Sequence, residues 1–145
     1  FVRWFMTSKP HKITSQVKYA PSGVDETVGI LLQNKEDEMA SIILSLHAKQ
    51  PKRGTISFDK GYIEIFEYPR GDEAVITYTE TGEKEVITAG NTEKALEYEI
   101  EDMEKAVLEN FDMHLNFTKD VMDIMTFIRN EWGMHYPEEE GREIL

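Results

Sequence analysis

The fold is decided by residues 27–48, which read TVGILLQNKEDEMASIILSLHA. A short strand is predicted over Thr27–Gln33, an acidic turn over Asn34–Glu38 and a second strand over Met39–Ala48. In the second strand alternate residues are apolar, and they share one face: Ala40, Ile42, Leu44 and Leu46. A period of two is typical of a half-buried strand, and so short a connection joins antiparallel neighbours. These residues therefore predict a β-hairpin.

The same period extends the sheet on both sides of this hairpin. Before it, Ile13–Tyr19 alternates, with Ile13, Ser15, Val17 and Tyr19 on one face. After it, glycines at Lys60-Gly61 and Thr81-Gly82 are expected to supply the positive φ that a hairpin turn needs. They join four further predicted strands, at Thr55–Asp59, Tyr62–Tyr68, Ala74–Glu80 and Glu83–Thr88. The middle of the chain is thus predicted to be an antiparallel meander.

Beyond Gly90 the apolar period becomes that of a helix. Leu96, Ile100, Met103 and Val107 recur at four-three-four spacing, which predicts a helix from about Thr92 to Glu109 with Asn91 as its N-cap. A second helix is predicted to begin at Thr118 and to end before Gly133. Its buried stripe is predicted to comprise Val121, Ile124, Met125, Ile128 and Trp132. Strands first and helices last predict an α+β fold, an open-faced, mainly antiparallel β-sheet with helices packed on one face.

Composition limits the kind of partner that the chain can have. Twenty-eight acidic and 16 basic residues give a net charge of -12, so we expect no nucleic-acid partner, because a surface that follows phosphates needs clustered Lys and Arg. No apolar run is long enough to cross a bilayer, and the absence of cysteine excludes a disulfide framework and a thiolate metal site. A single domain over residues 1–145, in the cytoplasm and away from membranes, fits these features best.

The residues carry no recognisable catalytic constellation. A glycine-rich dinucleotide fingerprint and a P-loop are both missing, and His11, His47, His114 and His135 do not have the spacing of zinc ligands. The carboxylates Glu97, Glu101 and Glu104 fall on the predicted helix face opposite the apolar stripe, where water solvates them. We therefore expect no catalytic, cofactor-binding or metal-ligating residue in this chain.

One sheet face is expected to meet a partner, because two helices are too few to shield both sides of about six strands. On the third predicted strand one face carries Ser41, Ile43, Ser45 and His47, and on the sixth Thr77 and Thr79 supply a similar surface. Neither set is charged, although the chain is strongly acidic. Since interface centres are depleted of charge, these six residues predict a face-to-face homodimer with two-fold symmetry.

Short motifs follow one another along the chain in a distinctive order. They are Gly-Val-Asp-Glu-Thr at 23–27, Gly-Thr-Ile at 54–56, Gly-Tyr-Ile at 61–63 and Ala-Leu-Glu-Tyr-Glu at 95–99. The end of the chain adds Phe117–Asp123, Ile128-Arg129 and Trp132-Gly133 through Tyr136-Pro137. Together they resemble the C-terminal domain of the Gfo/Idh/MocA oxidoreductases, and the dihydrodiol dehydrogenase-like branch is the most similar. The resemblance covers nearly the whole chain.

The resemblance implies a function that the residues alone do not. Members of that family have an N-terminal Rossmann domain that binds NAD or NADP, followed by a sheet domain that shapes the substrate site and mediates oligomerisation. This chain, which opens at Phe1, is similar to the second domain only, so it is expected to be a fragment that binds no cofactor and is inactive alone. The enzyme would act on a sugar, polyol or diol, its catalytic residues would lie upstream of Phe1, and Ala95 and Leu96 would lie beside the substrate.

Two alternatives stay open at this point. The chain can instead be a stand-alone, non-catalytic binding or assembly domain that uses the same architecture. The alternative for Leu96 is ordinary core packing in the first helix.

Overall fold

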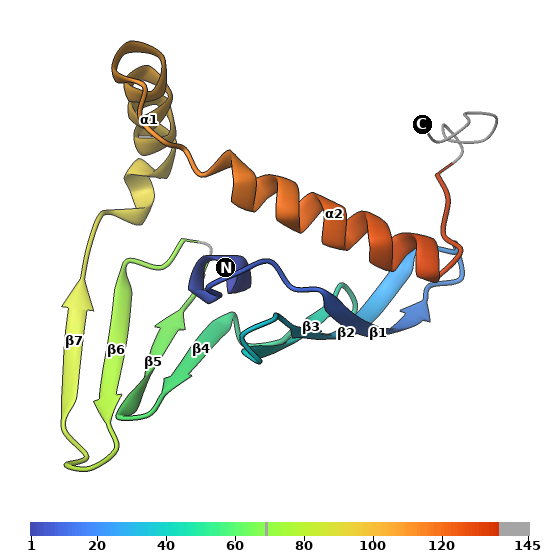
Figure 1. Ribbon diagram of the computed structural model, residues 1–145, viewed down its shortest axis with the longest axis horizontal. Coiled ribbons are helices and arrows are strands. Elements are labelled where there is room, and N and C mark those ends of the chain that lie inside the picture. The colour runs from blue at the N-terminus through green and yellow to red at the C-terminus, as the bar shows by residue number, and fades with distance from the viewer. Residues whose placement is uncertain (69, 137–145) are drawn as a thin grey trace. The chain divides into compact units, whose positions relative to one another are not determined.

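The structure, a computed structural model, describes residues 1–68 and 70–136, and its elements fall into two compact units (Figure 1). One unit is built from residue 1 and residues 50–115, the other from residues 2–49 and those from 116 onward. Two antiparallel sheets and two helices make the fold α+β, as the order of strands and helices predicts. The expected single sheet of about six strands is instead divided into one sheet of three strands and one of four. Pro137 of the last motif lies outside the described residues.

The predicted hairpin of residues 27–48 is present in a three-stranded antiparallel sheet. Its strands are β1 (Lys12–Tyr19), β2 (Asp25–Gln33) and β3 (Met39–Ser45), with β2 in the centre. The register is continuous through the middle of the sheet, where Gly29 lies between Gln16 and Ile43. The strand predicted to run to Ala48 ends at Ser45, where the hydroxyl oxygen accepts the backbone N–H of Ala48 at 3.0 Å and turns the chain out of the ladder.

The acidic turn between β2 and β3 is organised by a buried asparagine. Asn34 is fully buried, and its Oδ1 accepts the backbone N–H groups of Glu36 at 3.2 Å and Glu38 at 2.9 Å. The Glu38 carboxylate in turn accepts the N–H of Thr7 at 2.8 Å and its hydroxyl at 2.7 Å. The turn therefore also holds the segment that precedes β1.

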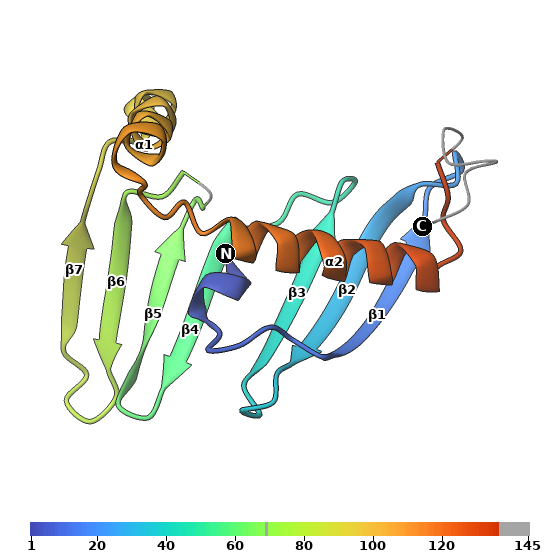
Figure 2. The same ribbon diagram turned by 45° about the horizontal axis from the view of Figure 1, so that its top comes forward.

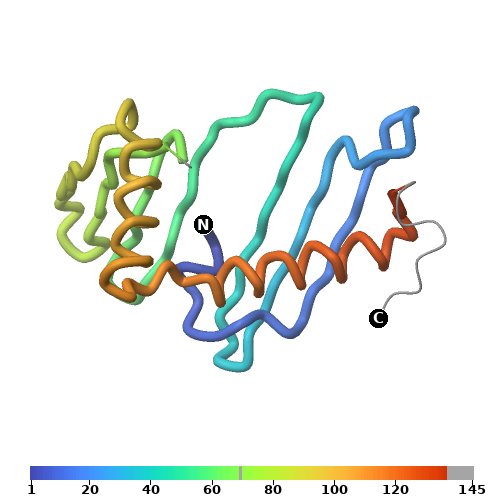
Figure 3. Tube along the Cα trace, turned by 90° about the horizontal axis from the view of Figure 1, so that it is seen from above, coloured from blue at the N-terminus to red at the C-terminus, as the bar shows by residue number. Residues whose placement is uncertain are grey.

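Helix α2 (Leu115–Glu131) crosses one face of this sheet (Figures 2 and 3). Leu32 of β2 forms the buried core with Ile124 and Ile128, and partly buried apolar side chains surround them, namely Val2, Ile13, Ile30, Ala40, Ile42 and Trp132. The Trp132 indole N–H donates to the Ser15 hydroxyl at 2.9 Å. One helical face with buried Ile124 and Ile128 is thus confirmed, and its helix packs on one side of the sheet.

The limits of the predicted α2 stripe are wrong in two respects. Met125, one position after Ile124, lies off the buried face and is 57% exposed. Val121 shares the side of Ile124 and Ile128 but lies nearer the start of the helix, where it is 38% exposed. The helix begins at Leu115 rather than Thr118, because His114 has a left-handed backbone with φ of 54° and the regular helix can start only after it. At the other end Gly133 has φ of 65°, as predicted for a residue that terminates a helix.

The N-terminal segment is fixed to α2 by charged contacts. It contains a short 3-10 helix, η1 (Val2–Phe5). The Arg3 guanidinium lies 4.3 Å from the Phe117 ring centroid, and its Nε donates to the Asp120 carboxylate at 2.7 Å. Lys9 donates to Asp123 at 2.6 Å. Residues before β1 and residues of α2 therefore cover the same sheet face together.

The second sheet has four antiparallel strands in sequence order, β4 (Arg53–Phe58), β5 (Gly61–Phe66), β6 (Glu73–Tyr78) and β7 (Lys84–Thr88). Gly82 has φ of 71°, as predicted for its turn. Gly61 does not have a positive φ, so that prediction is wrong. Gly61 begins β5 where a Cβ atom would lie 2.2 Å from the Thr77 carbonyl oxygen, and this close approach requires glycine instead.

Helix α1 (Ala95–Glu109) follows the one-turn 3-10 helix η2 (Thr92–Lys94). Asn91 caps η2, since its Oδ1 accepts the Glu93 N–H at 2.9 Å. Leu96 and Ile100 are 62% and 69% exposed, so the prediction that they pack on a sheet face is wrong. A three-residue connection with Gly90 at φ 76° directs α1 to the end of β7 rather than over the face of its sheet (Figures 1 and 2).

Candidate functional site

The candidate site is the face of the three-stranded sheet that lies opposite α2. Side chains alternate along each strand, so the residues between those of the core point to this second face. Two neighbouring rows of the register, Thr14–Leu31–Ser41 and Gln16–Gly29–Ile43, form its centre. We call these six residues the open face.

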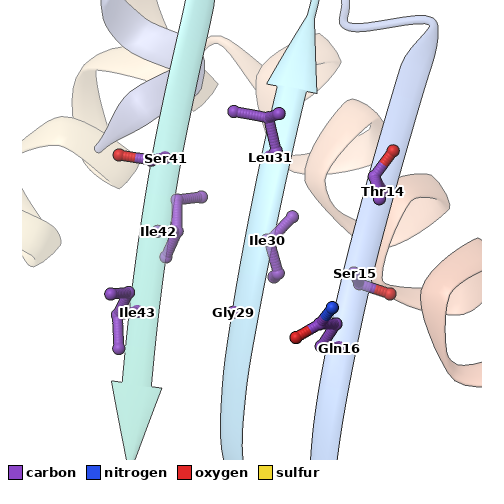
Figure 4. A pocket seen from close by; sticks show the side chains of 9 residues that line it. All are labelled: Thr14, Ser15, Gln16, Gly29, Ile30, Leu31, Ser41, Ile42 and Ile43. Atoms are coloured by element: carbon purple, nitrogen blue, oxygen red, sulfur yellow. The ribbon is translucent and has the colours of Figure 1, made fainter.

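The open face contains a shallow hollow of about 270 Å³. Glycine at position 29 leaves a gap in the middle of the sheet, and Figure 4 shows Gln16 of β1 and Ile43 of β3 on either side of it. Ile43 is 65% exposed although it is a large apolar residue in a strand. A hollow therefore lies directly beside a projecting apolar side chain.

Charged groups lie away from this centre. None of the six residues of the open face is charged, and Lys18, farther along β1, pairs with Glu26. The hydrogen bond from Lys18 is the largest influence on Glu26 and holds the pKa of that carboxyl below its ordinary value. At the same end of the sheet the hydroxyls of Thr27 and Ser45 lie 3.0 Å apart. The centre of the open face is uncharged and partly apolar, and the ion pair lies toward its end.

The predicted interface residues divide between the two units. Ser41, Ile43 and Ser45 lie on one face of β3, as predicted. His47 is exposed and lies beyond the end of β3, so it is not part of that strand face.

The residues predicted from the sixth strand belong to the four-stranded sheet and need a separate correction. Thr77 of β6 is buried, with a hydroxyl that has no hydrogen-bond partner in the described part of the chain. Thr79 lies in the turn after β6. Thr77 is therefore not available as a surface residue.

The predicted substrate residues lie at the start of α1. Ala95 is half-buried and Leu96 is exposed. A second hollow, of about 450 Å³, lies beside Thr92 of η2, and it is lined by Lys52, Glu67, Arg70 and Thr92. Two cationic side chains and one carboxylate can bind a polar ligand. All the lining residues precede Ala95 in the sequence, and Ala95 itself does not line this hollow.

Gly29 is the site residue that sequence reasoning missed. Glycine in the interior of a strand weakens the strand and marks a bulge, a bend or a close approach by another group. That signal was present in the sequence, between Val28 and Ile30. Thr14, Gln16 and Leu31 could be found only once the register was known.

The rest of the described chain adds no metal centre and no membrane span. No three His, Asp or Glu side chains among residues 1–68 and 70–136 come together in a way that suits a metal ion. Within the same residues no helix has both the length and the apolar character that crossing a bilayer demands.

Comparison with known proteins finds no family model that matches the chain and no curated protein of similar sequence.

Proposed function

We propose that this chain is the C-terminal domain of an NAD(P)-dependent oxidoreductase of the Gfo/Idh/MocA type, acting on a sugar, polyol or diol. In this proposal the nucleotide is bound by a Rossmann domain outside this chain, and the chain itself binds no cofactor. Its two roles are to complete the substrate site near Ala95 and Leu96 and to join two subunits through the open face.

The observation that carries the proposal is the placement of the motifs in an α+β fold. Gly-Thr-Ile falls on β4, Gly-Tyr-Ile opens β5, and Ala-Leu-Glu-Tyr-Glu opens α1. Two motif glycines have a structural reason: a Cβ atom at Gly54 would lie 2.2 Å from the Phe1 ring, and one at Gly61 would meet a backbone oxygen. The motifs are thus tied to particular close approaches in this fold. Architecture supports membership of a fold, and activity needs its own test.

The assembly role is supported by the chemistry of the open face. Its six central residues are uncharged in a chain of net charge -12, and Ile43 projects from it. Open sheet faces in contact with water usually carry Lys and Glu, whereas interface centres are depleted of charge. A second subunit packed on this face explains both the absence of charge and the exposed Ile43.

Nucleotide binding by the native polypeptide and by the 145-residue chain tests the proposal. The polypeptide that contains this sequence should be isolated from its source cells, weighed, and titrated with NADH and NADPH by calorimetry. A two-domain enzyme of this type is expected to exceed the 16.8 kDa of the chain and to bind one of the two nucleotides. The 145-residue chain is expected to bind neither, because it lacks a glycine-rich pyrophosphate turn.

Two results would contradict this proposal. Binding by the 145-residue chain tighter than about 100 μM, roughly -5.5 kcal/mol, would show that a nucleotide site exists within it. A native polypeptide of 16.8 kDa would favour the alternative, a stand-alone binding or assembly domain.

A further inference from the structure

Gly29 is an unexplained residue in the centre of the open face. Glycine in the interior of a strand costs roughly 0.5–1 kcal/mol relative to alanine, so it needs a reason. The usual reasons fail here. The register Gln16–Gly29–Ile43 is continuous, so there is no bulge, and the φ of Gly29 is not left-handed. A Cβ atom at this position would meet nothing within 4 Å. Among residues 1–68 and 70–136, no atom lies close enough to explain the glycine.

We propose that the hollow at Gly29 receives the Ile43 side chain of a second copy of this chain, and that Gly29 is the residue that decides whether two copies fit. The inference rests on the proposed assembly role of the open face and names the contact that specifies it. In each subunit Ile43 is the projecting group and Gly29 the receiving one.

The register makes this contact reciprocal. Gly29 and Ile43 are direct partners across β2 and β3, so the projection and the hollow lie side by side in one row. In a two-fold interface a residue i that contacts residue j of its mate is matched by j contacting i. A two-fold axis that passes between β2 and β3 at this row places the Ile43 side chain of each copy in the Gly29 hollow of the other copy. Sheets that pack face to face lie about 10 Å apart, a spacing that interdigitated side chains fill.

Charge favours a second copy over other occupants. Two chains of net charge -12 repel each other over most of their surfaces, so they can approach only where carboxylates are missing. The centre of the open face is such a place. Leu31 and Met39, 44% and 63% exposed on the same face, extend the apolar surface around Ile43. A charged small molecule would find no ionic partner among the six central residues.

The first test enlarges residue 29 and measures assembly by sedimentation equilibrium. Gly29→Leu fills the hollow and is expected to weaken dimerisation at least about fivefold, since overpacking costs about 1–3 kcal/mol. The free chain is expected to be at least as resistant to urea as the parent, because a Cβ atom there meets no neighbour and the cost of an interior glycine is removed. Gly29→Ala is the graded control: it should fold equally well and weaken dimerisation less than Gly29→Leu does.

The second test uses the absence of cysteine from the chain. Gly29→Cys and Ile43→Cys proteins are mixed under mild oxidation, and the disulfide between unlike chains is identified by mass. The expected product joins position 29 of one copy to position 43 of the other. Met39→Cys is the matched control, because Met39 is as exposed as Ile43 and lies on the same strand face but roughly 13 Å farther along β3. It should not cross-link to position 29.

The outcomes separate this inference from the assembly proposal. If the parent is a dimer and Ile43→Glu is a monomer, but Gly29→Leu still dimerises as tightly as the parent, the face is the interface and the Gly29 contact is wrong. Cross-linking of Met39→Cys in place of Ile43→Cys would overturn the contact in the same way. A parent that sediments at 16.8 kDa at ~100 μM, where an interface of about -5.5 kcal/mol is half associated, would overturn both.

Discussion

Ile124 is the α2 residue from which the packing of the helix can best be measured. It is buried against Leu32, so Ile124→Ala leaves a cavity and is expected to lower the free energy of unfolding by about 2–5 kcal/mol in urea denaturation. Met125→Ala, at the neighbouring and 57% exposed position, is the control and should change it by less than ~0.5 kcal/mol. Equal effects at the two positions would contradict the orientation of α2.

At the scale of single residues, the sequence predicts burial only for side chains that follow a periodic apolar pattern. Ile124 and Ile128 follow a helical repeat and are buried, as expected. Asn34 does not follow any repeat, and its burial depends on backbone N–H groups that converge only when the turn has formed. A glycine inside a strand is a signal that the sequence shows at Gly29, but only the structure shows that a Cβ atom there would meet nothing within 4 Å.

Among the elements, the segment before β1 should respond to acid through Glu38. Hydrogen bonds from the Thr7 hydroxyl and N–H are the main cause that holds the pKa of Glu38 below its ordinary value of 4.5. A depressed pKa contributes stability above the unfolded value and loses it as pH falls through the folded value. Protection of the Thr7 amide from hydrogen exchange, relative to its intrinsic rate, should therefore persist at pH 7 and decline below pH 4.5.

Glu38→Gln is the matched control for that measurement. A neutral amide cannot titrate, so protection of Thr7 should be weaker than in the parent at pH 7 and should not change around pH 4.5. If the parent and Glu38→Gln lost protection over the same pH range, another group would be responsible.

The elements show where pattern-based prediction ends. The antiparallel pairing of β2 with β3 follows from alternation and a short connection, the C-terminal limit of α1 at Glu109 follows from helical spacing, and both are confirmed. The start of α2 cannot be predicted from the spacing of apolar residues, because the left-handed backbone of His114 is a local conformation that no periodicity encodes. An apolar stripe on α1 predicts that the helix needs a partner surface, but it does not say which surface.

For the whole molecule the prediction of a single domain can be tested by unfolding. Both tryptophans, Trp4 and Trp132, belong to the unit that contains β1–β3, whereas both units contribute to far-ultraviolet circular dichroism. A single cooperative domain gives coincident urea transitions by the two methods. We expect coincidence in the parent and an equal shift of both transitions in Ile124→Ala. Separate midpoints would show that the units unfold independently and would contradict the single domain.

The contact between Arg3 and Asp120 joins residues 117 positions apart, and it sets an order of events during synthesis. Residues of β1–β3 leave the ribosome long before α2, which supplies Ile124 and Ile128 to the face around Leu32. At a synthesis rate of roughly 5–20 residues per second, about 6–23 s separate Arg3 from its partner. From the completion of β3 at Ser45 until α2 has been made, the apolar face of the nascent sheet has no helix over it, and in that part of the interval the new chain is most open to chaperones and to aggregation.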